Sequence, residues 1–420
     1  MSGADDVVVI GGGAIGACAA LELARRGAKV TLLERGPRLA SGCSEGNAGL
    51  ICPSHAEPLA SRAALVEGLR SLFDRDGPVA LHPRPALAPW VARFVAACTP
   101  TQERAGTRAI RSLSLASLLQ HEQLARELAT GVERRGTLNV YETEERFEHG
   151  RRAAERAKAD MRSEIMVGAD ASALEPALRG PVAGAVYYPD ELSGDPLAFV
   201  EAIGRAAEAA GVAVRTGVEV RALSASGRRI DRLETSAGAY AAGTVVLAAG
   251  VWSPRLAGRL GLSIPVVSGK GYHLDYAGAE GDPRVPLFLQ EARVVVTPLP
   301  GKLRLAGTLE LGGLDHSLND RRLEAVRRAG IRRVHGLDGR NVIHRWSGLR
   351  PCAPDGLPIV GRPRAYANLV VATGHAMLGF TLAPVTGVLV ADIVTGTQPS
   401  EDVTLLDPDR FAGLRSFAPH

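Results

Sequence analysis

The chain has 420 residues, 46% of them apolar and 22% charged, and this composition excludes a disordered or fibrous protein. Its 49 basic and 45 acidic side chains leave a formal net charge of only +4 and are mixed along the chain, without a basic tract interleaved with aromatic residues, so nucleic acid is not an expected partner. At about 150 residues per domain, the length predicts two or three domains.

Several features predict a cytoplasmic protein. Asp5 and Asp6 stand directly before the first apolar run, which is not typical of a signal peptide. The five cysteines are too few for a disulfide framework and lack metal-site spacing, so we expect a reducing compartment and no metal. The long uncharged stretch at residues 365–391 is interrupted by glycine, proline and histidine, which favours a strand, a turn and a buried helix over a membrane span. Any membrane contact is therefore expected to be peripheral, on the inner face.

The first motif is a short apolar strand that leads into a glycine-rich turn and a helix. Gly11, Gly13 and Gly16 have the GxGxxG spacing, which allows a tight turn, close approach of a pyrophosphate and tight packing of the helix on the strand. A second strand ends at Glu34, where a carboxylate would accept hydrogen bonds from a ribose; a solvated acid is the alternative. The unit predicts a dinucleotide site, with further contacts at Ala14, Ile15 and Arg35.

The pattern that follows favours a flavin over a nicotinamide dinucleotide. After Glu34 the chain enters a stretch rich in glycine, serine and proline at residues 41–58, and an apolar strand of nucleotide type returns only at residues 244–250. There is no second GxGxxG motif. A nucleotide-binding sheet split by long insertions looks like the FAD-binding fold of amine and amino-acid oxidoreductases, with one flavin and one organic substrate.

The middle of the chain is expected to bind the substrate. Residues 78–178 read as helix-rich, and residues 264–344 add strands that would form an antiparallel sheet over the flavin. The predicted fold class is α/β, with an FAD-binding Rossmann-like domain that is split in sequence and an α+β substrate domain on an antiparallel sheet. The FAD-binding domain would comprise residues 1–77, 179–263 and 345–420.

Three further segments carry a family resemblance: SEGNAGL at residues 44–50, RWSGLRPCAPDGLPIVG at residues 345–361 and ATGHAMLGFT at residues 372–381. With the GxGxxG unit, they make the chain resemble the D-amino-acid oxidase superfamily of FAD-dependent oxidoreductases, in its bacterial D-amino-acid dehydrogenase branch. The resemblance covers essentially the whole chain and is loosest in the middle, where the substrate is selected.

The resemblance implies an enzyme of amino-acid catabolism with noncovalent FAD, because Cys352 does not have the spacing of the cysteine that holds the flavin in the sarcosine-oxidase branch. The implied reaction is oxidative deamination of a D-amino acid by hydride transfer from the α-carbon to flavin N5, giving an imine or 2-oxo acid. D-Proline and cis-4-hydroxy-D-proline are candidate substrates. The alternatives are a glycine/sarcosine-type amine oxidase and a noncatalytic flavoprotein subunit. The electron acceptor (quinone, carrier or oxygen) and the oligomeric state stay open.

The resemblance also implies substrate-site residues. Arg350 matches the arginine that pairs with the substrate carboxylate, and a planar guanidinium suits that task; a surface arginine is the alternative. Tyr272 would touch the substrate or be a half-buried strand tyrosine. His375 would serve the flavin or substrate, or be a buried, hydrogen-bonded histidine. The roles of Lys270, beside Tyr272, and of His55 stay open.

A larger set of flavin contacts is implied in the same way. They lie in the glycine-rich segments and before the last apolar helix, whose N-terminus would stabilise negative charge on the reduced flavin. The implied contacts are Ser44, Asn47, Ala48, Gly49, Leu50, Val218, Ala249, Gly250, Trp252, Gly374, Met377, Leu378, Gly379, Phe380 and Thr381.

Overall fold

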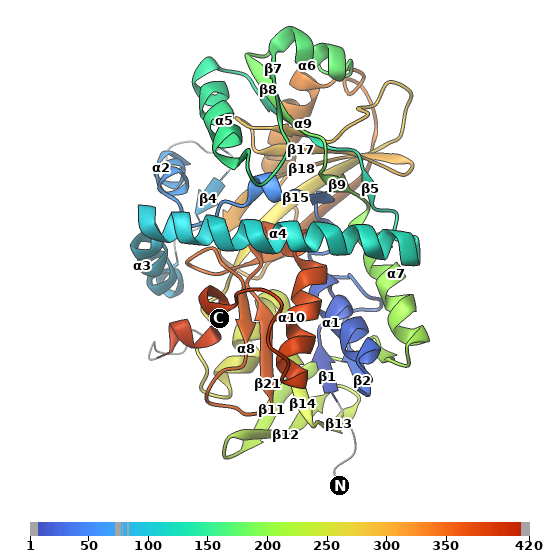
Figure 1. Ribbon diagram of the computed structural model, residues 1–420, viewed down its shortest axis with the longest axis vertical. Coiled ribbons are helices and arrows are strands. Elements are labelled where there is room, and N and C mark those ends of the chain that lie inside the picture. Colours follow the sequence, from blue (N-terminus) through green and yellow to red (C-terminus); the bar gives the residue numbers. More distant parts are fainter. Residues whose placement is uncertain (1–6, 72–76, 78, 82–83, 413–420) are drawn as a thin grey trace.

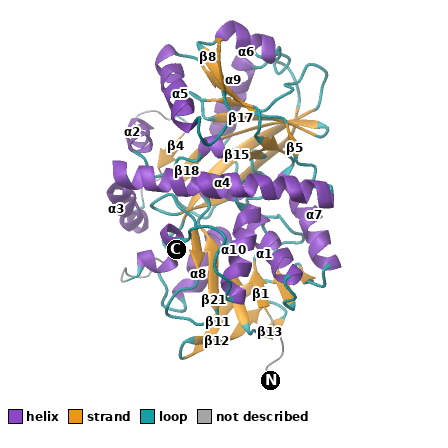
Figure 2. Ribbon diagram, in the orientation of Figure 1, coloured by secondary structure: helices purple, strands orange, loops and turns teal. Residues whose placement is uncertain are grey.

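The structure is a computed structural model that describes residues 7–71, 77, 79–81 and 84–412. Figure 1 shows two parts stacked along the long axis, with the helix α4 (Pro100–Leu128) lying across the middle. Helices from opposite ends of the chain, α1 (Ala14–Arg25) in blue and α10 (Ala383–Thr395) in red, pack side by side in the lower part. The upper part contains a large sheet with helices around it (Figure 2).

The lower part is built on a six-stranded sheet that is parallel except at one edge strand. Its central strands are continuous apolar runs, because a parallel sheet with both faces covered buries the side chains on both sides. The strand order is β10 (Ala213–Arg215), β2 (Val30–Leu33), β1 (Val7–Ile10), β14 (Thr244–Leu247), β21 (Leu369–Thr373) and β20 (Ile359–Gly361).

The two faces of this sheet have different covers. Alternate residues such as Val9 and Val246 pack with α1, α10 and α7 (Pro196–Ala209). Val8 and Val245 face the other side, toward α8 (Ser253–Gly258) and a small antiparallel sheet. That sheet consists of β11 (Val220–Ser226), β12 (Arg229–Thr235) and β13 (Gly238–Ala241).

The upper part is built on a nine-stranded sheet that is mostly antiparallel. The helix α9 (Asp320–Arg333) contacts its central strands, and α5 (Glu144–Ala157) and α6 (Gly168–Leu174) contact the β8 end. The strand order is β19 (Val342–Cys352), β15 (Val267–Ala277), β18 (Lys302–Leu311), β17 (Val294–Leu299), β16 (Leu287–Leu289), β6 (Thr137–Tyr141), β8 (Gly184–Tyr188) and β7 (Glu164–Val167), with β4 (Val79–Leu81) on β18.

The helix α4 connects the two parts. The Thr99 side chain caps its N-terminus, and Ile110 and Leu113 join the core under α1 and α10. The remaining elements are short: α2 (Arg62–Ser71), α3 (Ala88–Ala97), and a small sheet of β3 (Leu50–Ile51), β9 (Leu192–Ser193) and β5 (Glu133–Arg134). None of the helices in the described ranges combines the length and apolar character that a bilayer crossing requires.

The predicted fold class is confirmed: a Rossmann-like sheet assembled from distant segments stands beside a largely antiparallel one. Three elements lie differently from the predicted segments. Most of the strand β19 falls in the 345–420 segment but forms an edge of the large sheet beside β15. The strand β8, in the 179–263 segment, pairs with β6 and β7 in the large sheet. The helix α4, in the 78–178 segment, packs on the nucleotide-type part. The division into domains itself stays a prediction.

Candidate active site

A cavity of about 630 Å³ lies where the carboxyl ends of β1 and β14 meet the face of the large sheet formed by β19. In the sheet, β1 lies between β2 and β14, so the order in which the strands are added reverses at β1. The connections on the two sides of this point separate and leave a crevice at the carboxyl ends of the strands. The wall comes from segments far apart in sequence: residues 10–15, 33–37, 41–47, 218–221, 248–256, 346–351 and 372–380, with His316.

The glycine-rich turn at one end of this cavity has no room for side chains. Gly11 has φ +108°, and a Cβ there would lie 2.5 Å from the Ala248 carbonyl oxygen; a Cβ on Gly16 would lie 1.9 Å from the Gly11 carbonyl oxygen. The helix α1 begins directly after the turn, and the Ala14 N–H donates to Ser44 Oγ at 3.0 Å. The turn therefore lets a pyrophosphate approach the backbone at the start of the helix, as a phosphate site requires.

Polar and aromatic groups follow beyond the turn. The Glu34 carboxylate accepts hydrogen bonds from the N–H groups of Gly12 (2.7 Å) and Gly36 (2.6 Å) and lines the cavity. The Arg35 guanidinium lies 4.1 Å from the centre of the Trp252 ring, and both residues line the wall. This end offers a carboxylate and a flat aromatic and guanidinium surface, which suit a ribose and a base.

Arg350 lies on β19 at another part of the wall, partly buried. Its Nη1 donates to the Thr308 carbonyl oxygen at 2.8 Å, and its guanidinium lies against the Gly271 backbone, where a Cβ would be 2.2 Å from Cζ. Burial lowers the pKa of Arg350. Across the described ranges no carboxylate pairs with it. A desolvated cation without a counter-ion is costly, so this site favours an anionic ligand.

His375 lies between β21 and α10 and is 3% exposed. Its Nε2 pairs with Thr386 Oγ1 at 3.0 Å, while its Nδ1 has no hydrogen-bond partner within the described structure. Burial lowers the pKa of His375 to about 3, so the ring is neutral at ordinary pH. A buried, unpaired ring nitrogen in a residue of the cavity wall fits a ligand that offers a matching polar atom.

Comparison with known proteins identifies the family. The family model described as FAD dependent oxidoreductase matches residues 6–393. The chain belongs to this family. A protein named D-amino acid dehydrogenase from Paramagnetospirillum magneticum is 35% identical over 419 residues, covering 96% of this chain and 98% of that protein. A protein of the same name from Methylobacterium radiotolerans is 33% identical, with 95% and 98% covered. The crystal structure of glycine oxidase from Geobacillus kaustophilus has a TM-score of 0.80 at 25% identity, covering 97% of this chain and 100% of that one.

The predicted family and cofactor are thus confirmed, and the cavity of this FAD-dependent oxidoreductase fits the cofactor. The glycine turn without room for side chains suits the pyrophosphate. The residues implied by sequence that line the cavity are Gly11, Gly13, Ala14, Ile15, Glu34, Arg35, Ser44, Asn47, Val218, Ala249, Gly250, Trp252, Arg350, His375, Gly379 and Phe380.

The other implied flavin contacts do not line the cavity. Gly16 packs against the turn, and the Ala48 carbonyl accepts a hydrogen bond from Thr297. The Met377 carbonyl accepts one from the Asn47 side chain at 3.3 Å. Such residues can shape the site through the backbone without touching a ligand. The implied contacts outside the wall are Gly16, Ala48, Gly49, Leu50, Gly374, Met377, Leu378 and Thr381.

Tyr272 and Lys270 lie on the face of β15 that points away from the cavity. The Tyr272 side chain is 1% exposed in the core with α9, and its hydroxyl donates to the Glu310 carboxylate. Lys270 Nζ contacts Asp315 at 3.1 Å. Tyr272 is therefore a strand tyrosine, as in the alternative, but it is fully buried and not half-buried. His55 also lies off the cavity wall, with Nε2 at 3.0 Å from Asn139 Oδ1.

We did not predict several wall residues from the sequence, among them Cys43, Gly46, Trp346 and Leu349. A signal for Trp346 was present, because side chains alternate along a strand and residues 346, 348 and 350 of β19 must share one face. The same alternation on β15 places Gly271 opposite Gly348 and excludes Tyr272 from that face.

Proposed function

We propose that this protein is an FAD-dependent dehydrogenase that oxidises the Cα–N bond of D-amino acids. The observation that carries the proposal is Arg350, a partly buried guanidinium at the cavity wall with no acidic partner in the described residues. A substrate α-carboxylate would supply the missing charge. Support for the D-amino acid comes from relatives of that name at 31–35% identity over at least 94% of this chain.

In the proposed reaction, Arg350 orients the substrate and the wall excludes water. Thr308 and Gly271 hold the guanidinium, so it presents its remaining N–H donors in one direction. Trp346 lies on the same face of β19 as Arg350 and provides apolar surface. Bound FAD supplies the acceptor for the hydride that leaves the α-carbon. His375 stays neutral and serves as a hydrogen-bonding group rather than a proton carrier.

We further propose that FAD binds without a covalent bond. The Cys352 side chain is fully buried, and burial raises the pKa of its thiol to about 12. Attachment through sulfur needs a thiolate, which is scarce at this pKa. Denaturing the holoenzyme should therefore release all of the FAD, as measured by absorbance of the filtrate.

Anaerobic reduction tests the proposed activity. The oxidised holoenzyme is mixed with D- and L-amino acids, including D-proline, glycine and sarcosine, and the loss of flavin absorbance is followed by stopped flow. We expect D-amino acids to bleach the flavin. Arg350→Lys keeps the positive charge but removes the planar guanidinium that can donate two parallel hydrogen bonds to a carboxylate. The value of kcat/KM should therefore fall about 10- to 150-fold, as for the loss of one charge-assisted hydrogen bond.

The matched control is Arg345→Lys on the same strand, where the arginine is exposed and paired with Asp320. Its kcat/KM should stay close to that of the unmodified protein. Bleaching by L-amino acids or by glycine and sarcosine alone would contradict the proposal, as would an Arg350→Lys protein with unchanged kcat/KM. Peroxide formation in air at the rate of turnover would identify an oxidase instead of a dehydrogenase.

A further inference from the structure

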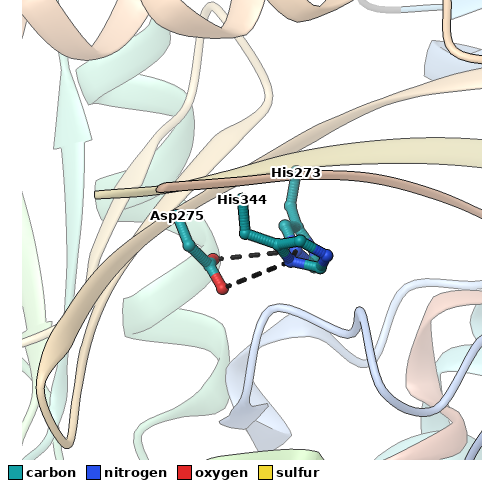
Figure 3. A group of neighbouring side chains, drawn as sticks. All are labelled: His273, Asp275 and His344. Carbon is teal, nitrogen blue, oxygen red and sulfur yellow. Dashed lines mark hydrogen bonds and ion pairs between the residues drawn. The ribbon is translucent and has the colours of Figure 1, made fainter. Parts of the chain in front are cut away.

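The face of β15 that points toward the cavity carries polar side chains beyond Gly271. His273 and Asp275 follow at two-residue spacing, and His344 lies on β19 opposite Asp275. Figure 3 shows these three side chains converging below the two strands. Arg304, on β18, pairs with Asp275 from the other side. The proposed catalytic contacts use none of these residues.

Side chains of the large sheet bind four successive carbonyl groups of the loop that forms part of the cavity wall. Arg304 Nη1 donates to the carbonyl oxygens of residues 45 and 47, both at 2.9 Å. His273 Nδ1 lies 3.3 Å from the carbonyl oxygen of residue 46, and Thr297 Oγ1 donates to that of residue 48 at 2.7 Å. Ser44, Gly46 and Asn47 of this loop line the cavity. The orientation of the loop therefore depends on these donors.

Asp275 fixes the main donor. Its two oxygens accept from Arg304 Nε and Nη2 at 2.8 and 2.9 Å, and both residues are 2% exposed. A guanidinium held at two nitrogens presents its third nitrogen in one direction, so the ion pair sets the position of the loop carbonyls. His273 adds a second contact, because its ring stacks on Trp346 with 5.0 Å between centres and an angle of 10°. Trp346 also lines the cavity.

The same side chains have the spacing of metal ligands, but their charges argue against a cation. His273 Nε2 lies 3.3 Å from His344 Nδ1 and 3.7 Å from Asp275 Oδ1, and His344 Nδ1 lies 3.9 Å from Asp275 Oδ2. However, both Asp275 oxygens already pair with Arg304, and Lys302 Nζ is 3.8 Å away. A divalent ion would add two positive charges beside two existing ones, with one buried carboxylate to share.

We propose that Arg304, Asp275, His273 and Thr297 are positioning residues for FAD: they hold the loop at residues 44–48, and His273 also holds Trp346, at the cavity wall in the arrangement that binds the flavin. The ion pair lies in the large sheet, and Ser44 of the loop accepts a hydrogen bond from the Ala14 N–H at the start of α1, so the cluster couples the two parts of the molecule at the cofactor. This inference rests on FAD occupying the cavity and not on the identity of the amino-acid substrate.

The test compares two buried arginines. Arg304→Lys keeps a positive charge near Asp275 but loses the arm that reaches the loop. Arg322→Lys is the matched control, because Arg322 is also buried and pairs with a carboxylate, Glu310 at 3.0 Å, on the opposite face of the sheet. Each protein is measured for its unfolding midpoint, for its FAD dissociation constant after reconstitution, and for the visible absorbance and circular dichroism of bound flavin.

We expect both variants to lose stability, but only Arg304→Lys to weaken FAD binding, by about tenfold or more, and to change the flavin spectrum. If Arg304→Lys fails to fold, Thr297→Val is the substitute variant, because it removes one contact with the loop at nearly constant side-chain volume. We expect its FAD dissociation constant to rise by about two- to tenfold. The proposal would be overturned if Arg304→Lys and Arg322→Lys had equal FAD affinities and flavin spectra. If Arg304→Lys does not fold, the proposal would be overturned by equal FAD affinities and spectra in Thr297→Val and the unmodified protein.

A zinc titration distinguishes the other interpretation of the cluster. Binding of one equivalent of Zn²⁺ to the holoenzyme at micromolar concentration, lost in His344→Ala, would identify a metal site and overturn the positioning role. Because flavin binding is measured without an amino acid, the outcome does not depend on the proposed dehydrogenase activity. If no amino acid reduces the bound flavin, but the Arg304→Lys protein binds FAD less tightly than the unmodified protein, the proposed activity is refuted and this inference is supported.

Discussion

Tyr272 and Arg350 lie on neighbouring strands, yet they serve opposite sides of the same sheet. Arg350 faces the cavity across Gly271, whereas the Tyr272 ring packs in the core and its hydroxyl binds Glu310. A difference of one position along a strand reverses the direction of the side chain. At the scale of single residues, the site is therefore determined by which face of β15 and β19 each residue occupies.

Tyr272→Phe tests this assignment. The change removes the hydroxyl that donates to a buried carboxylate, so the free energy of unfolding should fall by about 1–3 kcal/mol. The value of kcat/KM with a D-amino acid should stay within about twofold, because the hydroxyl does not reach the cavity wall. Denaturant titration and steady-state kinetics measure the two quantities. A loss of kcat/KM above about tenfold at unchanged FAD content would place Tyr272 at the substrate.

At the scale of elements, the contact between α1 and α10 positions the cavity. Gly387 of α10 lies against the Cys18 backbone of α1, where a Cβ would be 2.8 Å from the Cys18 carbonyl carbon. Both helices begin next to cavity-lining segments: α1 after Gly13, and α10 shortly after Phe380. The separation of the two helix axes is therefore linked to the shape of the cofactor site.

Gly387→Ala should force these helices apart. We expect a loss of about 1–3 kcal/mol in the free energy of unfolding, as for an overpacked core, together with weaker FAD binding. Gly258→Ala is the control, because Gly258 also lies in a helix, α8, but a Cβ added there would meet no atom of another element within 4 Å. Its stability should be unchanged or slightly raised. An unfolding midpoint for Gly387→Ala equal to that of Gly258→Ala would show that the helices accommodate the methyl group.

The elements differ in how far the sequence could predict them. The strands at residues 7–10 and 244–247 were predictable, because apolar runs beside a GxGxxG turn have few other interpretations. The direction of Tyr272 was also available from the alternation along β15. The pairing of β8 with β6 and β7 could not be predicted, because an apolar sequence does not indicate which strands it pairs with. The Arg304–Asp275 pair was equally hidden, because its residues are 29 positions apart and meet only in the folded sheet.

At the scale of the whole molecule, buried histidines make stability depend on pH. Burial lowers the pKa of His55 and His121 to about 4 and of His273 and His375 to about 3. In the unfolded chain these rings bind protons below about pH 6.5, whereas the folded protein keeps them neutral. Acidification below pH 6.5 therefore favours unfolding, by about 1 kcal/mol for each ring at pH 5.5.

Glu191 acts in the opposite direction. Burial raises the pKa of its carboxyl to about 7, so between pH 7 and about 4.5 the folded protein binds a proton that the unfolded chain does not. Acidification through this range stabilises the fold by about 2 kcal/mol by pH 5.5. Four histidines outweigh one carboxyl, so the sum predicts a net loss of stability between pH 7.5 and pH 5.5.

The unfolding midpoint of the holoenzyme, measured in excess FAD, should therefore fall as the pH is lowered from 7.5 to 5.5. His121→Gln should reduce the slope, because His121 is fully buried and a glutamine takes up no proton, whatever its cost in packing at pH 7.5. His149→Gln, at an exposed position on α5, should leave the slope unchanged. A midpoint that rises on acidification would mean that Glu191 dominates, and an unchanged slope in His121→Gln would mean that this ring gains its proton in the folded state.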